Sequence, residues 1–380
     1  MATRSGKTAY TKRKMNKLLS LIIKILSGVF GACLLVFLYL VIFTDTFNPL
    51  VRLYKIDVPL TAKLTASNEN LFYLSGSQLD CVDFGGKEKW SSEFAGSGYS
   101  VAVSDTLECV YNGTSASVLD TKKNVLFSVP AAEYTFLDAK CGSSCVAILS
   151  CLQGDTALYY IRVFNYAGEE IYRTSYENAD VLSFDIFGDT DNLWVLTLDT
   201  TGVSPVSRIS TFSPSQNAMT GTIDISDQLI SDVFYADATM YLSGTYNLLS
   251  YDTFGQKQQS TLVYGLKCID SVFSGNNYTL IYMQRSDDDV SQASTLRVLS
   301  GSEGNEVDSF LQLPSDVVSV YASSSYVYCF LEDSVYAYKL TGEFYKEIKL
   351  DFELKKAVKI SADKVALYSA DSETYYMRLS

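Results

Sequence analysis

The chain has 380 residues, of which 47% are hydrophobic and 19% are charged, so it is long enough for one large domain or two ordinary ones. Its formal net charge is −13, and it contains no histidine. The composition excludes a disordered tail, a collagen and a multi-pass membrane protein, and the lack of histidine excludes every catalytic, haem or zinc site that needs this residue.

Basic residues are concentrated at the start of the chain. Residues 1–44 contain seven basic residues and no acidic one, which leaves 23 basic against 43 acidic residues in the rest, a net charge of −20 there. Because phosphate contacts come from Lys and Arg, such an acidic body predicts that nucleic acid is not a partner. The seven basic residues are Arg4, Lys7, Lys12, Arg13, Lys14, Lys17 and Lys24.

An apolar stretch over residues 18–44 follows this basic tail. Ile25–Phe43 contains 19 residues without a charge. As a helix this stretch would span about 29 Å, the thickness of a hydrocarbon core. Lys24 can extend its ammonium group to the head groups, and the basic residues before it hold the tail, residues 1–17, in the cytoplasm. The sequence therefore predicts a single-pass signal anchor in the cytoplasmic membrane, with the bilayer as one partner and the rest of the chain outside.

Two other kinds of signal are alternatives to an uncleaved anchor. A cleaved signal peptide has an apolar region of about 7–15 residues and a small-residue cleavage site, whereas this apolar region is longer and no such site follows. A lipoprotein signal would use Cys33, but Leu34–Phe43 would then leave a strongly apolar amino terminus. The uncleaved anchor fits the sequence better.

Residues 45–60 form a short connector, and residues 61–380 have the composition of β-strands separated by turns. A unit of strand, tight turn, strand, glycine turn and strand recurs about every 40 residues, the length of a four-stranded propeller blade. Eight copies predict an all-β, eight-bladed β-propeller; seven blades is the alternative, if the weak copy Glu108–Asp120 is an insertion. The copies are Leu71–Trp90, Glu108–Asp120, Val146–Glu169, Leu193–Phe212, Tyr241–Gln256, Tyr278–Leu299, Tyr326–Glu343 and Val365–Leu379.

The last copy lacks its outer strand. Val51–Val58, just after the apolar stretch, can supply it, because joining both chain ends in one blade removes exposed strand edges. The turn before the outer strand carries a glycine in several copies, as expected where a tight turn needs a positive φ. These glycines are Gly86, Gly168, Gly255 and Gly342.

One turn has a more specific pattern. Asp83, Gly85, Gly86, Lys87 and Trp90 resemble the repeat of quinoprotein-type propellers, which carries an Asp, a Gly-Lys turn and a Trp. The resemblance implies an eight-bladed ring, as in quinoprotein dehydrogenases and in the bacterial outer-membrane assembly lipoprotein of that fold. The whole chain also resembles a family of uncharacterised membrane-anchored propellers of Gram-positive anaerobes, a domain of unknown function, which implies no biochemistry.

Eight cysteines are present, and Cys33 lies in the apolar stretch. Seven remain, so at least one cannot pair within the chain. Cys141 and Cys145, with Cys151 nearby, are the only cluster; a disulfide between Cys141 and Cys145 is its candidate role, because a metal site would need a fourth ligand. Four cysteines in apolar strands are expected to be buried core residues: Cys81, Cys109, Cys268 and Cys329.

Two acidic clusters are candidates for calcium sites. One is Asp287–Asp289, and the other contains Asp185, Asp189 and Asp191. Neither matches a calcium-binding loop, so both are predicted to be solvated loops. Quinoprotein dehydrogenases carry adjacent cysteines beside their cofactor, and this chain has no such pair. No metal, cofactor or catalytic residue is therefore predicted.

Most of the 28 tyrosines lie in predicted strands, where aromatic rings pack between blades. Tyr99, Tyr166 and Tyr246 lie in loops and are candidates for a recognition face. A propeller without catalytic residues predicts a non-enzymatic scaffold that binds an envelope or membrane protein. The alternatives are a surface sensor that binds a glycan, peptide or other small ligand at the propeller mouth and, less favoured, a degenerate quinoprotein-like enzyme. A scaffold should expose an apolar patch, and a sensor should have a deep aromatic pocket.

Overall fold

The computed structural model describes residues 28–33, 36, 51–59, 62–67, 69–187, 191–236, 238–275, 277–287, 289–301 and 306–379. The chain divides into two compact units, residues 1–52 and 53–380. In the first unit, residues 28–33 and 36 are helical. Within the described residues, no helix combines the length and the apolar character needed to cross a membrane. The predicted tail and most of the predicted anchor lie outside the described residues, including Arg4, Lys7, Lys12, Arg13, Lys14, Lys17, Lys24, Ile25 and Phe43.

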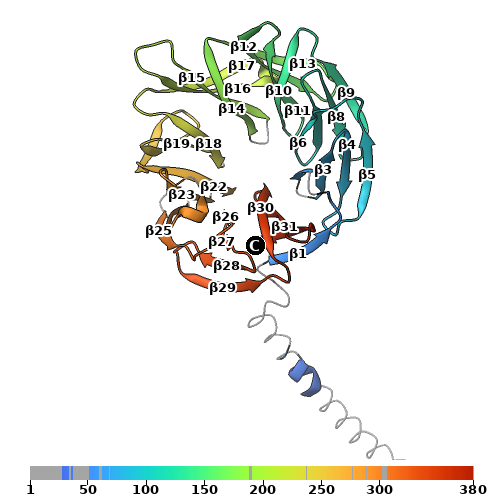
Figure 1. Cartoon of the computed structure of the whole chain (residues 1–380). Helices are drawn as coiled ribbons and strands as arrows, with labels where there is room; N and C mark the ends of the chain where they lie inside the picture. The colour runs from blue at the N-terminus through green and yellow to red at the C-terminus, as the bar shows by residue number, and fades with distance from the viewer. Residues whose placement is uncertain are drawn as a thin grey trace, which may run out of the picture. The chain divides into compact units, whose positions relative to one another are not determined.

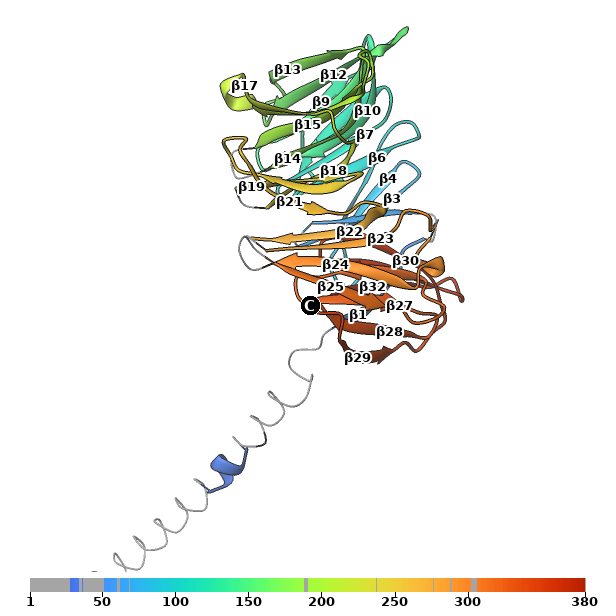
Figure 2. The same ribbon diagram turned by 90° about the vertical axis from the view of Figure 1, so that its left-hand side faces the viewer.

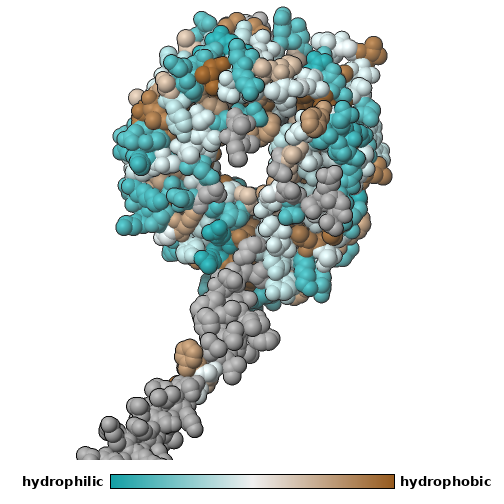
Figure 3. Space-filling view, turned by 180° about the vertical axis from the view of Figure 1, so that it is seen from behind, coloured by the Kyte–Doolittle hydropathy of each residue, from teal (hydrophilic) through white to brown (hydrophobic). Residues whose placement is uncertain are grey.

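Eight four-stranded sheets form a ring (Figure 1). The eight-bladed β-propeller predicted from the repeats is confirmed. The weak copy at Glu108–Asp120 supplies the two middle strands of a complete blade, so the seven-bladed alternative is wrong. The space-filling view shows an opening through the centre of the ring (Figure 3).

Each blade has an inner strand, a second strand, a third strand and an outer strand, and blades 1 to 8 follow the chain order of their inner strands. The inner strands are β2 (Lys63–Ala66), β6 (Ser100–Val103), β10 (Tyr134–Cys141), β14 (Ala179–Phe187), β18 (Ile230–Ala236), β22 (Leu266–Ser274), β26 (Ser319–Ala322) and β30 (Leu354–Ser361). The second strands are β3 (Leu71–Ser75), β7 (Leu107–Tyr111), β11 (Cys145–Leu152), β15 (Asn192–Asp199), β19 (Thr239–Gly244), β23 (Asn277–Gln284), β27 (Tyr326–Phe330) and β31 (Lys364–Ser369).

The outer half of each blade is built in the same way. The third strands are β4 (Gln78–Val82), β8 (Ser115–Asp120), β12 (Asp155–Asn165), β16 (Val206–Ser213), β20 (Asn247–Tyr251), β24 (Thr295–Gly301), β28 (Ser334–Lys339) and β32 (Thr374–Leu379). The outer strands are β5 (Glu88–Glu93), β9 (Val125–Pro130), β13 (Glu170–Glu177), β17 (Ala218–Ile225), β21 (Lys257–Leu262), β25 (Val307–Gln312), β29 (Phe344–Lys349) and β1 (Val51–Ile56). Two short 3₁₀ helices, η1 (Pro214–Gln216) and η2 (Val290–Gln292), lie in loops.

The hydrophobic core lies between neighbouring blades. Side chains alternate along a strand, so one strand can pack against two neighbours. In β7, Cys109 and Tyr111 pack in the cluster shared with blade 3, and Val110 packs in the cluster shared with blade 1. Second strands are therefore buried along their length, and they read as continuous apolar runs in the sequence.

Blade 8 joins the two ends of the propeller. β1 lies next to β32 and is the outer strand of that sheet. Thr374 Oγ1 donates a hydrogen bond of 3.1 Å to the carbonyl oxygen of Val58, and the rings of Tyr54 and Tyr376 stack with centroids 6.1 Å apart. The end of β1 thus lies beside the start of β32, and the exposed edge that three strands alone would leave is covered.

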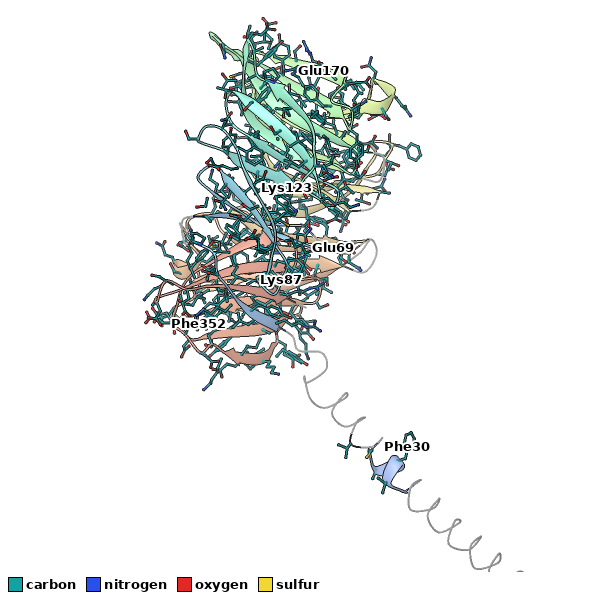
Figure 4. The ribbon with its side chains drawn as sticks, turned by 90° about the vertical axis from the view of Figure 1, so that its right-hand side faces the viewer. Phe30, Glu69, Lys87, Lys123, Glu170 and Phe352 are labelled. Atoms are coloured by element: carbon teal, nitrogen blue, oxygen red, sulfur yellow. The ribbon has the colours of Figure 1, made fainter. Side chains whose placement is uncertain are left out.

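Strands run between the two faces of the ring (Figure 2). Within a blade consecutive strands are antiparallel, so the connections fall on alternate faces. We call the face that carries the links between blades and the turns between second and third strands the connection face. The opposite face carries the other two turns of each blade and is called the hairpin face. Phe352, in the link from blade 7 to blade 8, and Glu69, in the first turn of blade 1, mark the two faces (Figure 4).

Candidate functional site

The quinoprotein-like turn forms a local hydrogen-bonded structure on the hairpin face. Asp83 Oδ1 accepts hydrogen bonds from the backbone N–H groups of Gly85 (2.9 Å) and Lys87 (3.0 Å), and Gly86 has φ +80°. The hydrogen bond from the Lys87 N–H, in particular, lowers the pKa of the Asp83 carboxyl. The same two bonds recur in other blades, where the first turn residue is Asp120, Asn165 or Asp252.

The residue with positive φ is not always glycine. Gly168, Gly255 and Gly342 have φ between +72° and +84°, whereas Lys123 takes this position in blade 2. Lys123 was not predicted from the sequence, because glycine was the signal. In blade 8 the positive-φ Ser372 lies in a different turn, between the second and third strands. A Cβ atom on Gly342 would lie 2.4 Å from the carbonyl oxygen of Phe310, so this turn packs directly against the outer strand of the preceding blade.

Trp90 joins blades 1 and 2. Its Nε1 donates a hydrogen bond of 3.3 Å to the carbonyl oxygen of Thr121, in the glycine-type turn of blade 2. The residues predicted as repeat turns therefore lie in separate blades and build the ring. They do not converge on one binding site.

The candidate disulfide between Cys141 and Cys145 is not formed. All eight cysteines are free thiols in the structure. The reason is the strand geometry: Cys141 packs against the cluster shared by blades 2 and 3, and Cys145 is buried in the cluster shared by blades 3 and 4. Burial raises the pKa of the Cys145 thiol to about 12, as it also does for Cys81 and Cys109.

One side chain from each acidic cluster is held by hydrogen bonds within the protein. Asp191 accepts hydrogen bonds from the N–H and O–H groups of both Ser143 and Ser144, and Asp289 caps η2 through the N–H of Ser291. Asp189 and Asp288 lie outside the described residues. In the part of the chain that the structure describes, no group of three or more acidic or cysteine side chains could hold a metal ion.

The three loop tyrosines do not form one recognition face. Tyr99 is buried, and its hydroxyl donates to the carbonyl oxygen of Ala95 (2.6 Å). Tyr166 is exposed on the hairpin face and donates to the carbonyl oxygen of Ser143 (2.7 Å). Tyr246 is exposed on the connection face, so it alone remains a recognition candidate.

Tyr246 lines a groove of about 530 Å³ on the connection face. The groove is formed by loops of blades 4, 5 and 6, and we call it the tyrosine groove. The ring of Tyr264 stacks on that of Tyr246, with centroids 5.4 Å apart and an interplanar angle of 16°. The groove residues are Ser204, Pro205, Ser226, Asp227, Gln228, Leu229, Thr245, Tyr246, Tyr264, Gly265 and Arg285.

Gln228 fixes the wall of this groove. Its side-chain oxygen accepts hydrogen bonds from the N–H groups of Tyr246 (3.0 Å) and Asn247 (2.8 Å), which holds Tyr246 in place. The residue is only 5% exposed, and its Nε2 atom is buried without a hydrogen-bond partner. A buried amide donor that has no partner is costly, and Gln228 is one of the residues that line the groove.

The rest of the groove combines exposed apolar side chains with the hydroxyl groups of Ser204, Ser226 and Thr245 and one charge of each sign. Tyr264 is 69% exposed, Tyr246 46% and Leu229 41%. Asp227 and Arg285 line the groove, and Arg285 donates to the carbonyl oxygen of Leu266 (3.1 Å). Tyr264, Leu229 and Gln228 were not predicted from the sequence. The available signal was Tyr264 itself, an aromatic residue directly before Gly265, which has a positive φ at the link between two blades. Aromatic and Arg side chains around an apolar surface are typical of protein-binding sites.

Comparisons with known proteins show the family and the fold. The model of a family of unknown function (DUF5711) matches residues 61–379. No curated protein matches.

Three solved structures are similar in fold. BamB from Moraxella catarrhalis has a TM-score of 0.54 and 12% identity, over 86% of this chain and 100% of that one. The C-terminal WD40 domain of Sif2 has a TM-score of 0.53 and 12% identity, over 86% of this chain and 99% of that one. A quinohemoprotein alcohol dehydrogenase from Pseudomonas putida HK5 has a TM-score of 0.52 and 8% identity, over 87% of this chain and 76% of that one. At these identities the likeness shows the propeller fold alone.

Proposed function

Because the chain belongs to this family of unknown function, we propose its role from the geometry: it is a non-enzymatic, membrane-anchored, extracytoplasmic propeller that binds a protein partner in the cell envelope. The observation that carries this proposal is the tyrosine groove. Its exposed apolar side chains gather on one face of an otherwise acidic molecule. Large exposed apolar patches are typical of interaction surfaces.

The chemistry of the groove favours an extended protein segment. The unpaired amide of Gln228 suits a backbone carbonyl oxygen, and the stacked faces of Tyr246 and Tyr264 suit an apolar or aromatic side chain next to it. Leu229 extends the apolar surface. The partner we propose therefore presents an extended peptide with an apolar anchor residue.

The anchoring is proposed from the sequence of residues 1–44, with the amino terminus in the cytoplasm.

A sensor that binds a glycan is the second candidate function. The parallel rings of Tyr246 and Tyr264 favour it, since sugars stack on aromatic faces. A deep pocket would be expected for such a site, whereas both rings here are largely exposed to solvent. The shallow groove therefore fits a protein surface better.

Site-specific photocrosslinking in cells tests the proposal. A photoreactive amino acid replaces Tyr264 in the full-length chain, and the matched control carries it at Tyr345, an exposed tyrosine on β29. We expect one or two envelope proteins to be captured from position 264 and not from position 345. The double substitution of Tyr246 and Gln228 by Ser should abolish that capture.

Three outcomes would overturn the proposal. Equal capture from positions 264 and 345 would remove the groove as the binding site. No protein capture together with binding of a glycan by the purified chain would replace the scaffold with the sensor. A chromophoric cofactor released from the purified protein, together with turnover of an alcohol substrate, would make it a quinoprotein-like enzyme.

A further inference from the structure

A second hollow lies on the connection face, where blade 8 meets blade 1. Its volume is about 590 Å³, and it lies between the inner strands β30 and β2 and the end of β31. Three lysines line it: Lys63 from β2, and Lys355 and Lys356 from β30. Leu64, Val358 and Tyr368 form an apolar wall. We call it the lysine pocket.

The charge of this pocket is opposite to that of the molecule. The body after residue 44 has 43 acidic against 23 basic residues, yet no acidic residue is among those that line the pocket. Among the described residues, Lys355 pairs with Glu353, both more than half exposed, and Lys63 has a contact of 3.4 Å to Ser100 Oγ. Glu353 offsets one of the three positive charges, so the lysines and this carboxylate together keep a net charge of about +2.

A β-bulge brings two of the lysines to the same hollow. Neighbouring residues of a regular strand point to opposite sides of the sheet. The register of β30 against β31 shifts between Leu354 and Lys356, which inserts one extra residue, Lys355. Consecutive lysines then line one hollow, although their ammonium groups repel each other. The inner strands of blades 3 to 6 carry the same register shift, so the bulge is a recurring feature of the blade, and in blade 8 the residues at this position are lysines.

We infer that the lysine pocket binds a phosphate-bearing ligand whose carbon part lies against Leu64, Val358 and Tyr368. With Glu353 beside Lys355, the net charge of about +2 matches a phosphate dianion, whereas a single carboxylate would leave one ammonium group uncompensated. Lysine acts as a point charge on phosphate oxygens and needs no fixed fork geometry. The inference is independent of the tyrosine groove, which lies in other blades.

Calorimetric titration of the full-length chain in micelles of an uncharged detergent tests this inference. The probes are pyrophosphate and a poly(glycerol phosphate) of defined length. The pocket variant is Lys63→Met with Lys356→Met, and the control variant is Lys257→Met with Lys349→Met, two exposed lysines on outer strands. Both variants remove two charges, and the thermal midpoint of each shows whether it is folded.

We expect the wild-type chain and the control to bind alike, and the pocket variant to bind at least about tenfold more weakly, because two of three ammonium groups are lost. Added NaCl should weaken binding, as it does for exposed charges. Binding of pyrophosphate alone identifies a free ion as the ligand, and binding of the polymer alone identifies a phosphodiester chain. No binding of either probe, or equal loss in the pocket and control variants, would overturn the inference.

Discussion

Two buried carboxyl groups, in blades 6 and 2, lie in contrasting surroundings. In blade 6, both oxygens of Asp270 lie 2.7 Å from Lys359 Nζ, and Oδ2 also accepts a hydrogen bond from the N–H of Ala322 (2.7 Å). Lys359 belongs to blade 8 and Ala322 to blade 7, so this carboxylate connects three blades. Lys359 Nζ also donates to the carbonyl oxygen of Ser271 (3.1 Å).

In blade 2, Glu108 is fully buried, and neither of its carboxyl oxygens has a hydrogen-bond partner. It lies on β7 between Val103 and Leu119, and it points to the same side as Val110, toward the cluster shared with blade 1. Burial, with a smaller effect of the Asp120 charge, raises its pKa to about 8. At neutral pH Glu108 is therefore mainly a protonated, uncharged side chain.

Burial alone does not decide the state of a carboxyl group. It raises the pKa of Asp270 and lowers that of Lys359, although their mutual attraction opposes both shifts. Their contact of 2.7 Å is that of an ion pair. Glu108 has no such partner among the described residues, and burial keeps its proton bound instead. The contact between Asp270 and Lys359 should therefore hold blades together, and Glu108 should make the stability of the ring depend on pH.

Lys359→Met breaks the three-blade contact and should have the largest effect. It leaves Asp270 buried without its cation, and removing one partner of a buried ion pair costs about 3–5 kcal/mol of unfolding free energy. Urea unfolding at neutral pH measures the loss. Lys356→Met, on the same strand but exposed, is the matched control and should change stability by less than about 0.5 kcal/mol.

The double variant Asp270→Asn with Lys359→Met separates two explanations. If the loss comes from the unpaired carboxylate, the double variant should recover much of it, because no buried charge remains. If both variants lose the same stability, the packing of the Lys359 side chain explains the effect, and the comparison with Glu108 no longer holds.

Glu108→Gln tests the other side of the comparison through pH. The folded pKa is raised from 4.5 to about 8, so unfolding releases a proton between these values, and stability falls as pH rises from about 4.5 to about 8. Glutamine has no such proton. Relative to this variant, the wild type should lose up to ~5 kcal/mol across that window and then change no further.

Unfolding free energies of both proteins at several pH values between 4 and 9 measure this difference. Glu177→Gln replaces an exposed carboxyl on β13 and is the control. A difference between the wild type and Glu108→Gln that stays constant with pH would show that Glu108 is not protonated in the folded ring.

The sequence predicted the repeat well and the site poorly, for a physical reason. Strand alternation and turn residues are local, so the unit around Asp83 and Gly86 identified eight blades. The tyrosine groove and the lysine pocket depend on loops or strands brought together from different blades. Tyr264 and Gln228 have no shared motif, and the bulge at Lys355 is visible only in the register of two strands. Asp270 and Lys359 are 89 residues apart.

A third buried carboxylate, Asp191, is intermediate between the two compared above. No cation among the described residues pairs with it, but it accepts four hydrogen bonds from Ser143 and Ser144, at 2.5 to 2.9 Å, and so joins blade 4 to the first turn of blade 3. Asp191→Ala should cost about 2 kcal/mol of unfolding free energy, because two backbone donors lose their charged acceptor while water can reach part of the turn.

Asp199→Ala is the control for Asp191→Ala. Asp199 is also in blade 4, but its carboxylate accepts bonds only from the nearby Thr201, so it joins no second blade. Urea unfolding of the two variants should therefore rank Asp191→Ala above its control and below Lys359→Met. If Asp191→Ala costs as much as Lys359→Met, hydrogen bonds alone stabilise a buried carboxylate as well as a cation does, and the absence of donors, not of a cation, distinguishes Glu108.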